Sequence, residues 1–496
     1  MKIQSLSNNK KRVDPREGMR VPIVLNVSDS IMPCAKTLER LAAIASHDSV
    51  CSHVAALSDI HYKPRNECPT GTAIVTEDKI VPQFIDAGLN CGMRMIKTPL
   101  FDRDLPDSAV TALFRKMQER IPITAKNNVK LSHEEFFEIA RKGAPYIIEK
   151  HGLDPEEAAF IEFGGNMFAD EKVDDEDIRE CIPDTFRNMS LARFGTLGKG
   201  NHFIELQKIE DIVDDEIARI LGVEKNQIVV LMHTGSSALG NLASNFYAPR
   251  KMPPHRALFM FLERLRFYGL SFSVFGAEID RLFRVLTNRQ GFQALDEDSK
   301  DAVLFLRAMK AAHNFGYASR TRIMELIRKS FAETLGKPDF RMSLLYDMSH
   351  VSIFREEHFG KKVWVHRHGA TRAFPSNRVN GHPVFGKTGE PVFVPGSMGD
   401  PTYLGVGHPE NFDTYFSSSH GAGVADSGGK PLASDKETLT RKMHQRKVQL
   451  FKNGTENLSK IDPDRFKNIE IVVNGMRENK IIRLVAKLSP IAVMKG

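Results

Sequence analysis

The sequence is poor in cysteine and has a single tryptophan in 496 residues. Its five cysteines are odd in number and form no C-x-x-C pair. A disulfide framework and a zinc knuckle both depend on paired cysteines, so this pattern argues against each of them. We therefore expect a protein of a reducing compartment.

Long hydrophobic runs are also missing. No stretch approaches the roughly 18 consecutive apolar residues of a membrane-spanning helix, and the N-terminal region carries KKRVDPREGMR where a signal peptide has an apolar segment. We expect neither secretion nor membrane insertion, and predict that the protein is cytoplasmic.

The chain has no repeat of fixed period and no low-complexity linker. Its length allows either several domains or one elaborated domain, and the absence of a linker favours one compact unit with insertions. Basic residues outnumber acidic ones, 69 to 62, for a net charge of +7 that is spread along the chain. This charge favours a phosphate or nucleic-acid partner.

Local patterns predict both strands and helices. Residues 22–98 mix short apolar runs with turn signals, which is typical of strands and loops, whereas 104–151 has helical spacing with a capping box at Ser132 and Glu135. The apolar run at the end of 224–232 predicts a buried strand that stops at the polar segment HTGSS.

Two helical stretches, 255–288 and 299–336, come next, and the second carries His313, which we interpret as a hydrogen-bonded helix residue rather than a ligand. After residue 340 the segments KKVWVHR, PVFV, NIEIVV and IIRLVAKL are strand-like, and Ser434 with Glu437 predicts one more capped helix. The predicted fold class is α+β, a β-rich body with helical insertions.

Four histidines stand in short polar or glycine-rich segments: His202 in KGNHFIEL, His233 in VVLMHTGS, His350 in YDMSHVS and His420 in SSSHGAG. Imidazole binds first-row divalent metals, and Cys91 can add a thiolate. Taken singly, each histidine is better explained as a hydrogen-bonded residue beside a turn. Donors this far apart in sequence converge only through the fold.

Two loops each fit a functional and a structural interpretation. PGSMG, residues 395–399, has the glycines for a nest of backbone N–H groups that binds phosphate, but Pro-Gly pairs also mark ordinary turns. HRHGATRAF places Arg367 and Arg372 near two histidines, which suits phosphate or carboxylate binding and equally suits a solvated basic loop.

Taken together and in order, six segments resemble the signature blocks of the RtcB-type RNA ligases, from about Asp59 to Gly496: FGTLGKGNHFIEL, VVLMHTGSSALG, VHRHGATRAFP, PGSMG, SSHGAG and PIAVMKG. The resemblance implies a single RtcB-like domain over 1–496. Its expected parts are an N-terminal metal-site part (about 22–100), a helical insertion (about 101–190) and a nucleotide-binding and catalytic part (191–496).

By that resemblance the protein joins RNA with a 2′,3′-cyclic phosphate or 3′-phosphate end to RNA with a 5′-hydroxyl end, using GTP and Mn²⁺, with two ions expected. His420 is the expected nucleophile, which takes up GMP as a covalent phosphoramidate. The expected metal ligands are Cys91, His202, His233 and His350. The expected nucleotide-binding residues are Asn201, His202, Phe203, Ile204, Glu205, His350, Val351, Pro395, Gly396, Ser397, Met398, Thr402, His420, Gly421, Ala422, Gly423 and Lys495.

The sequence also departs from the family pattern. Gly88 stands where the family has an aspartate that binds metal, Asp86 is the carboxylate that a rearranged loop would bring in its place, and Asp59 matches another acidic position. Three further positions lose an arginine or an amide of the family: Ser237, Val351 and Val424. A hydrogen bond to a charged group is worth roughly 1.5–3 kcal/mol, so we expect a divergent member with altered RNA-end or GTP binding.

The leading hypothesis is a GTP-dependent RNA ligase of RNA repair or tRNA splicing, with RNA ends and GTP as partners and an archease-like activator as a candidate partner. Two alternatives stay open. The lost contacts suit a non-catalytic RNA-end or nucleotide-binding protein, and the metal ligands alone would suffice for a 2′,3′-cyclic phosphodiesterase.

Overall fold

Two large β-sheets carry most of the strands in this computed structural model, which describes residues 2–16, 18–64, 66–126, 128–287, 291–425, 436–452 and 462–496. The seven-stranded sheet contains, in spatial order, β1 (Gln4–Ser7), β2 (Lys10–Val13), β3 (Ile23–Leu25), β4 (Val50–His61), β5 (Thr70–Thr76), β13 (Lys361–His368) and β12 (Val351–His358). Only β3 and β4 pair in parallel in this sheet.

The eight-stranded sheet holds strands from distant parts of the chain. Its order is β11 (Ser343–Ser349), β7 (Gly92–Phe101), β9 (Gln227–Thr234), β8 (Phe203–Ile212), β19 (Ile482–Lys495), β16 (Thr402–Gly407) and β15 (Pro391–Pro395), with β18 (Gln449–Lys452) added beside β19. Two small ribbons complete the strands: β6 (Lys79–Ile80) with β10 (Leu295–Asp296), and β14 (Ala370–Arg372) with β17 (Ser417–Ser419).

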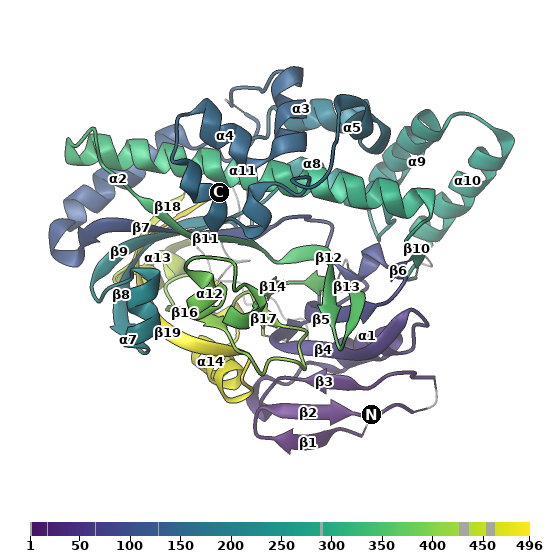
Figure 1. Cartoon of the computed structure of the whole chain (residues 1–496), viewed down its shortest axis with the longest axis horizontal. Coiled ribbons are helices and arrows are strands. Elements are labelled where there is room, and N and C mark those ends of the chain that lie inside the picture. The colour runs from purple at the N-terminus through teal and green to yellow at the C-terminus, as the bar shows by residue number, and fades with distance from the viewer. Residues whose placement is uncertain are drawn as a thin grey trace.

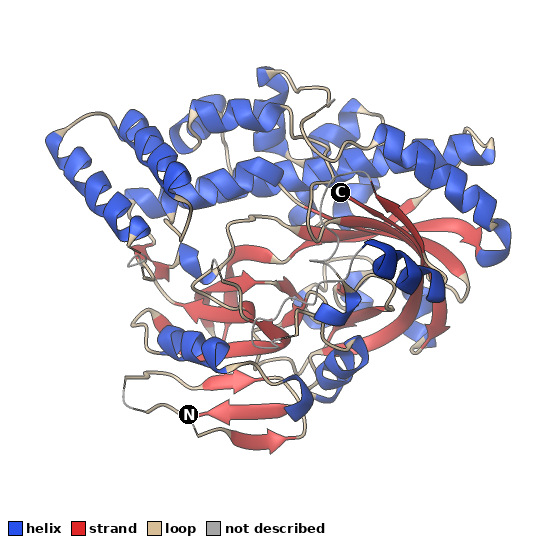
Figure 2. Cartoon of the chain, turned by 180° about the vertical axis from the view of Figure 1, so that it is seen from behind, coloured by secondary structure: helices blue, strands red, loops and turns tan. Residues whose placement is uncertain are grey.

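Most of the larger helices gather on one side of the sheets, where α11 runs across the molecule, whereas α1, α7, α12, α13 and α14 lie elsewhere (Figures 1 and 2). The helices are α1 (Ala35–Ala45), α2 (Asp107–Arg120), α3 (His133–Lys142), α4 (Ala144–Lys150), α5 (Asp175–Cys181), α6 (Asp184–Leu191), α7 (Asp215–Leu221), α8 (Ser237–Tyr247), α9 (Pro254–Tyr268), α10 (Phe272–Leu286), α11 (Lys300–Leu335), α12 (Phe385–Thr388), α13 (Lys436–Gln445) and α14 (Ile469–Glu478).

The long helix α11 is the main support of the helical layer. It has 36 residues, and at 1.5 Å per residue it is about 54 Å long. The hydroxyl of Ser299 caps its start by accepting a hydrogen bond from the backbone of Ala302, and Gly336 ends it in the left-handed conformation. Most of its middle is buried, including His313, whose Nδ1 donates to the carbonyl of Met309 at 2.9 Å, as predicted.

The predicted mixture of helices and strands is confirmed. Helices α2, α3 and α4 occupy the stretch predicted as helical between 104 and 151, and Ser132 and Glu135 form the predicted capping box. Strand β9 ends at His233 and Thr234, close to the predicted boundary. Among the described helices, none is both long enough and apolar enough to cross a membrane.

The stretch 255–288 is helical, as predicted, but it forms two helices because the chain turns at Gly269, which has φ +84°. Two local predictions are wrong. The segment 22–98 contains helix α1. NIEIVV lies in α14 and not in a strand. Its β-branched residues favour a strand, but Asn468 caps a helix and the buried positions Ile469, Val472, Val473 and Met476 follow helical spacing, so burial outweighs local propensity. The predicted cap at Ser434 lies outside the described residues.

Candidate active site

One edge of the eight-stranded sheet gathers residues that are far apart in the sequence. Strand β7 begins immediately after Cys91, and β9 ends immediately after His233. The two strands are antiparallel, with Gly92 opposite Thr234, so the start of one meets the end of the other. Antiparallel pairing therefore places the cysteine and the histidine at the same edge.

The neighbouring strands bring two more histidines to this edge. Strand β8 begins after His202, with Phe203 opposite His233. Strand β11 ends at Ser349, opposite Gly92, and His350 connects it to β12 of the other sheet. The site therefore lies where the chain passes from one large sheet to the other (Figure 1).

The cysteine and three histidines predicted as metal ligands form a cluster. The Sγ of Cys91 lies 3.3 Å from Nε2 of His202 and 3.3 Å from Nε2 of His233. The Nε2 of His350 lies 3.0 Å from that of His233. In the described part of the chain, Cys91, His202 and His233 are the one group of three or more such donors within 4.8 Å of one another. Typical metal–ligand lengths of about 2.0–2.3 Å fit an ion among them.

Burial keeps the imidazoles of this cluster neutral. It lowers the pKa of His202 to about 4 and holds the pKa values of His233 and His350 well below the usual range. The Nδ1 of His202 donates to the carbonyl of Leu197 at 2.9 Å, which leaves its Nε2 lone pair directed at the cluster. Burial raises the pKa of the Cys91 thiol to about 12, and a coordinated metal drives the deprotonation of such a thiol.

A buried arginine of α11 connects the two loops that carry these ligands. Arg320 donates through Nη1 to the carbonyls of Asn90 at 3.1 Å and Thr234 at 2.9 Å, and through Nη2 to Oδ1 of Asn90 at 2.6 Å. Its Nε pairs with Asp347, which also binds Arg94. Arg320 thus ties the residue before Cys91 to the residue after His233. Sequence analysis missed it, and a charged residue on the apolar side of the helix was its only signal.

Asp86 does not replace the carboxylate missing at Gly88. It forms an ion pair with Lys63 and accepts a hydrogen bond from the backbone N–H of Ala87 at 2.6 Å, and it is not part of the donor cluster. A Cβ placed at Gly88 would lie 3.9 Å from the Cβ of Cys91, an ordinary contact, so the loop has room for a side chain there.

His420 is oriented by two acceptors at the same ring nitrogen. Its Nδ1 lies 2.7 Å from Oδ2 of Asp59 and 2.7 Å from the carbonyl of Gly369. Both partners accept, so Nδ1 carries the proton and Nε2 keeps its lone pair. The ring stacks on that of His350, with centroids 4.5 Å apart. The Nε2 of His420, which keeps its lone pair, therefore lies next to the cluster of Cys91 and the three histidines.

Two glycines allow this close packing. Gly369 has φ +60°, and a Cβ there would lie 3.1 Å from Cε1 of His420 and 2.3 Å from the side chain of Thr70. Gly423 has φ +71°, and a Cβ there would lie 2.3 Å from the carbonyl oxygen of Asp59. The glycines around His420 therefore let the segment of Asp59 approach it.

A cavity of about 550 Å³ contains this cluster and most of the predicted nucleotide-binding residues. Two predicted contacts do not line it. Ile204 points to the opposite face of β8 from Phe203 and Glu205 and is buried in the core. Thr402 is buried and accepts a hydrogen bond from Nε2 of Gln207 at 2.7 Å. The other predicted residues on the cavity wall are Asn201, Phe203, Glu205, Val351, Pro395, Gly396, Ser397, Met398, Gly421, Ala422, Gly423 and Lys495.

The cavity wall also includes His368 of the HRHGATRAF segment, and residues without a local sequence signal, namely His61, Lys63, Asn241 and Arg465. Only the fold brings them to the site.

Glu205 and Lys495 lie on the paired strands β8 and β19 and both line the cavity. Burial raises the pKa of Glu205 to about 7, and burial lowers the pKa of Lys495 to about 8 although Glu205 opposes the change. The Nζ of Lys495 lies 5.0 Å from the centre of the Phe203 ring.

The arginines of HRHGATRAF bind carboxylates of the protein itself. Arg367 is fully buried and pairs with both oxygens of Glu356, at 2.5 and 2.9 Å. Arg372 pairs with Glu390 through Nη2 at 2.5 Å. The interpretation as a solvated loop is wrong, because these charges are paired inside the protein.

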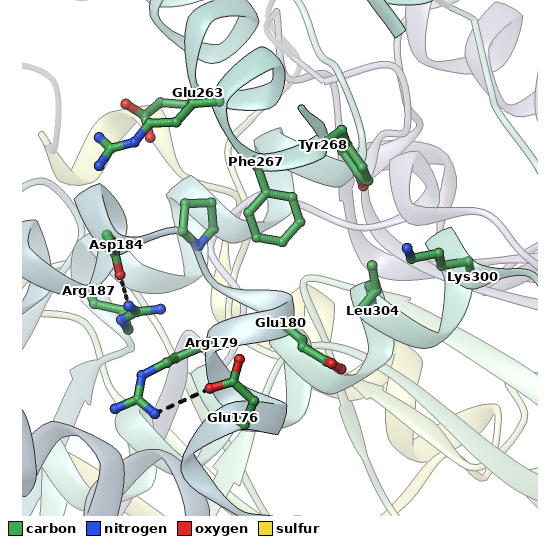
Figure 3. A pocket seen from close by; sticks show the side chains of 12 residues that line it. Glu176, Arg179, Glu180, Asp184, Arg187, Glu263, Phe267, Tyr268, Lys300 and Leu304 are labelled. Carbon is green, nitrogen blue, oxygen red and sulfur yellow. Dashed lines mark hydrogen bonds and ion pairs between the residues drawn. The ribbon is translucent and has the colours of Figure 1, made fainter. Parts of the chain in front are cut away.

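A second cavity, also of about 550 Å³, lies between α5, α6, α9 and α11 (Figure 3). Acidic and basic side chains line it in equal numbers, and pairs such as Arg179 with Glu176 and Arg187 with Asp184 join within its wall. None of the predicted site residues lines it.

Comparison with known proteins identifies the family. Residues 40–496 match the family described as "tRNA-splicing ligase RtcB". Similar proteins named "tRNA-splicing ligase RtcB" occur in Nanoarchaeum equitans (31% identical, 97% of each chain covered), Aeropyrum pernix (28%, 97% of each) and Thermococcus kodakarensis (28%, 96% of this chain and 95% of the other). The chain, with a cysteine and four histidines gathered at one end of its eight-stranded sheet, therefore belongs to the RtcB family.

Proposed function

We propose that the protein is an RNA ligase that uses GTP and Mn²⁺ to join RNA ending in a 3′-phosphate or 2′,3′-cyclic phosphate to RNA with a 5′-hydroxyl end. The observation that carries the proposal is the orientation of His420. Asp59 and Gly369 hold its Nδ1 proton, so the Nε2 lone pair faces the cavity beside the Cys91 cluster. That arrangement suits a nucleophile that attacks phosphorus.

In the first step, Nε2 of His420 attacks the α-phosphorus of GTP. An N–P bond forms, the bond from that phosphorus to the bridging oxygen breaks, and pyrophosphate leaves. The ring becomes positively charged, and the buried carboxylate of Asp59 stabilises that charge through Nδ1. A divalent ion held by Cys91, His202, His233 and His350 would supply Lewis-acid neutralisation of the phosphate oxygens.

A 2′,3′-cyclic phosphate end is first opened by water to a 3′-phosphate. In the second step, an oxygen of the RNA 3′-phosphate attacks the phosphorus of the GMP on His420, the N–P bond breaks, and the imidazole becomes neutral again. The 5′-hydroxyl of the other RNA then attacks the activated phosphate, and GMP leaves. Lys495, which lines the cavity with its pKa lowered to about 8, is cationic at neutral pH and suits contact with the nucleotide.

Incubation with radiolabelled GTP and Mn²⁺ tests the proposal. We expect an acid-labile protein adduct, and sealed product when RNA with the two ends is added. His420→Ala should abolish both, whereas His133→Ala, an exposed histidine at the start of α3, should change neither. A wild-type protein that forms no adduct, or an adduct that survives His420→Ala, would refute the mechanism.

The same assay separates the alternatives. Opening of a 2′,3′-cyclic phosphate that persists without GTP indicates a phosphodiesterase, and RNA-end binding without any product indicates a binding protein. We propose tRNA halves as the substrate class because the relatives are named tRNA-splicing ligases. Addition of an archease-like protein tests the proposed activator, which should raise the yield of adduct.

A further inference from the structure

The α9–α10 hairpin carries an unusual share of exposed apolar side chains. It projects from the end of the molecule, on the right in Figure 1 and on the left in Figure 2. Of the sixteen large hydrophobic residues that are exposed in the described chain, eight lie between Leu258 and Leu286. Leu270 is 83% exposed and Phe272 is 97% exposed.

Five of these residues form a stripe along α10. They are Phe272, Phe275, Ile279, Phe283 and Leu286. At about 100° per residue, their positions fall within about 80° of the helix circumference. The stripe therefore faces one direction.

The opposite side of α10 packs on the protein. Glu278 is buried and pairs with Arg264 of α9 at 2.7 Å, and Val285 is also buried. The hairpin is thus closed on its inner side. Of the stripe, Phe275 also contacts the ring of Phe261 on α9, with centroids 6.1 Å apart, and the rest of each exposed side chain is left open by the described chain.

The stripe is symmetric about Ile279. Phe275 and Phe283 lie four residues before and after it, and Phe272 and Leu286 lie seven residues before and after it. If two α10 helices pair antiparallel about a two-fold axis through Ile279, then Phe272 meets Leu286, Phe275 meets Phe283 and Ile279 meets its own copy. Every residue of the stripe then has an apolar partner, as a self-complementary dimer interface requires.

We propose that the stripe is a dimer interface and that a second copy of this chain covers it. The five residues of the stripe present roughly 600 Å² of apolar surface per copy, taking about 200 Å² for a whole side chain. Two copies would bury about 1,200 Å², which is at the lower end of the range for specific interfaces. The charged residues beside the stripe are already paired, Arg284 with Asp280 at 2.7 Å.

The dimer leaves the candidate active sites accessible. No residue of α9 or α10 lines the cavity that contains His420. Each copy therefore keeps its own site, and loss of the dimer should leave nucleotide transfer intact.

Substitutions that place a charge at Ile279, on the proposed two-fold axis, test the proposal. We expect the wild-type chain to have twice its own mass in analytical ultracentrifugation at micromolar concentration. Ile279→Glu places two like charges opposite each other, so it should weaken association at least about a hundredfold. The matched control is Val213→Glu, an equally exposed apolar residue outside the hairpin, which should stay dimeric.

A mixture of Ile279→Glu with Ile279→Lys distinguishes this interface from any other use of the hairpin. The two variants place opposite charges at the axis, so each should be monomeric alone and the mixture should be dimeric. A monomeric wild type, a dimeric Ile279→Glu chain, or a mixture that stays monomeric would each overturn the proposal. Equal melting temperatures of the variants and the control show that the chains are folded.

Discussion

Replacing Arg320 with methionine should weaken the proposed metal binding, although Arg320 contacts none of the four proposed ligands. Its guanidinium donates to the carbonyls of Asn90 and Thr234 and to the side chain of Asn90, and these residues flank Cys91 and His233. Without the arginine, the two ligand-bearing loops lose the group that sets their separation. Such outer contacts are typically worth 10–100-fold in metal affinity, which corresponds to about 1.4–2.8 kcal/mol.

The substitution also affects stability, and the two effects can be separated. Three buried acceptors on Asn90 and Thr234 lose their donor at a cost of about 1–3 kcal/mol each, so we expect a loss of about 3–9 kcal/mol in the free energy of unfolding. The remaining pair, Arg94 with Asp347, is neutral overall, so the variant buries no unpaired charge.

Arg94→Met is the matched control. Arg94 is as completely buried as Arg320 and binds the same carboxylate, but its other contacts are Thr321 and Met324 on α11. Its removal should destabilise the fold without loosening the ligand loops. Equilibrium dialysis with Mn²⁺, together with the thiolate absorption of a Co²⁺-loaded sample, measures metal binding independently of catalysis.

The result that refutes this reasoning is equal metal affinity in Arg320→Met and Arg94→Met. It would show that the sheet alone positions Cys91 and His233. A thermal melt in the absence of metal gives the stability difference between the two variants.

Three further predictions concern single residues. Asp59→Asn should reduce adduct formation on His420 by roughly 10²–10⁴-fold. The amide N–H can donate to Nδ1, which places the ring proton on Nε2 and removes its lone pair, while Mn²⁺ affinity stays unchanged. Gly88→Asp should raise Mn²⁺ affinity by about tenfold or more in equilibrium dialysis, because it adds an oxygen donor where the loop has room. Burial raises the pKa of Glu356, but Arg367 outweighs it and holds that pKa at about 2, compared with an ordinary 4.5. This pairing stabilises the fold by about 3 kcal/mol above pH 4.5, and the stabilisation is lost as the pH falls toward 2, so Glu356→Gln should melt lower at neutral pH by a difference that shrinks in acid.

Each of these predictions has a result that contradicts it. Unchanged adduct yield in Asp59→Asn would mean that the carbonyl of Gly369 alone orients the ring. Unchanged Mn²⁺ affinity in Gly88→Asp would mean that the new carboxylate points away from Cys91. A melting difference for Glu356→Gln that is the same at every pH would mean that Glu356 is not ionised in the folded protein.

Local structural features could be predicted from the sequence. The capping box at Ser132, the buried strand before His233 and the helix around His313 depend on neighbours a few residues apart, and all three are present. NIEIVV shows the limit, because its local preference for a strand lost to the burial of a helical face. The family blocks pointed to residues that the fold brings to one cavity, because motifs keep residue identity.

The sequence alone determined which donors are available, namely five thiols and the imidazoles of seventeen histidines. The tertiary structure decided which of them meet. Cys91 and His350 are neighbours only because β7 and β11 pair antiparallel, and Arg367 is a buried structural group rather than a ligand-binding one only because Glu356 lies on the paired strand. Asp86, in the loop before Cys91, forms an ion pair with Lys63 and does not join the cluster. Contacts between distant residues are set by strand pairing and by competition among buried charges, and neither is encoded within a short window of the chain.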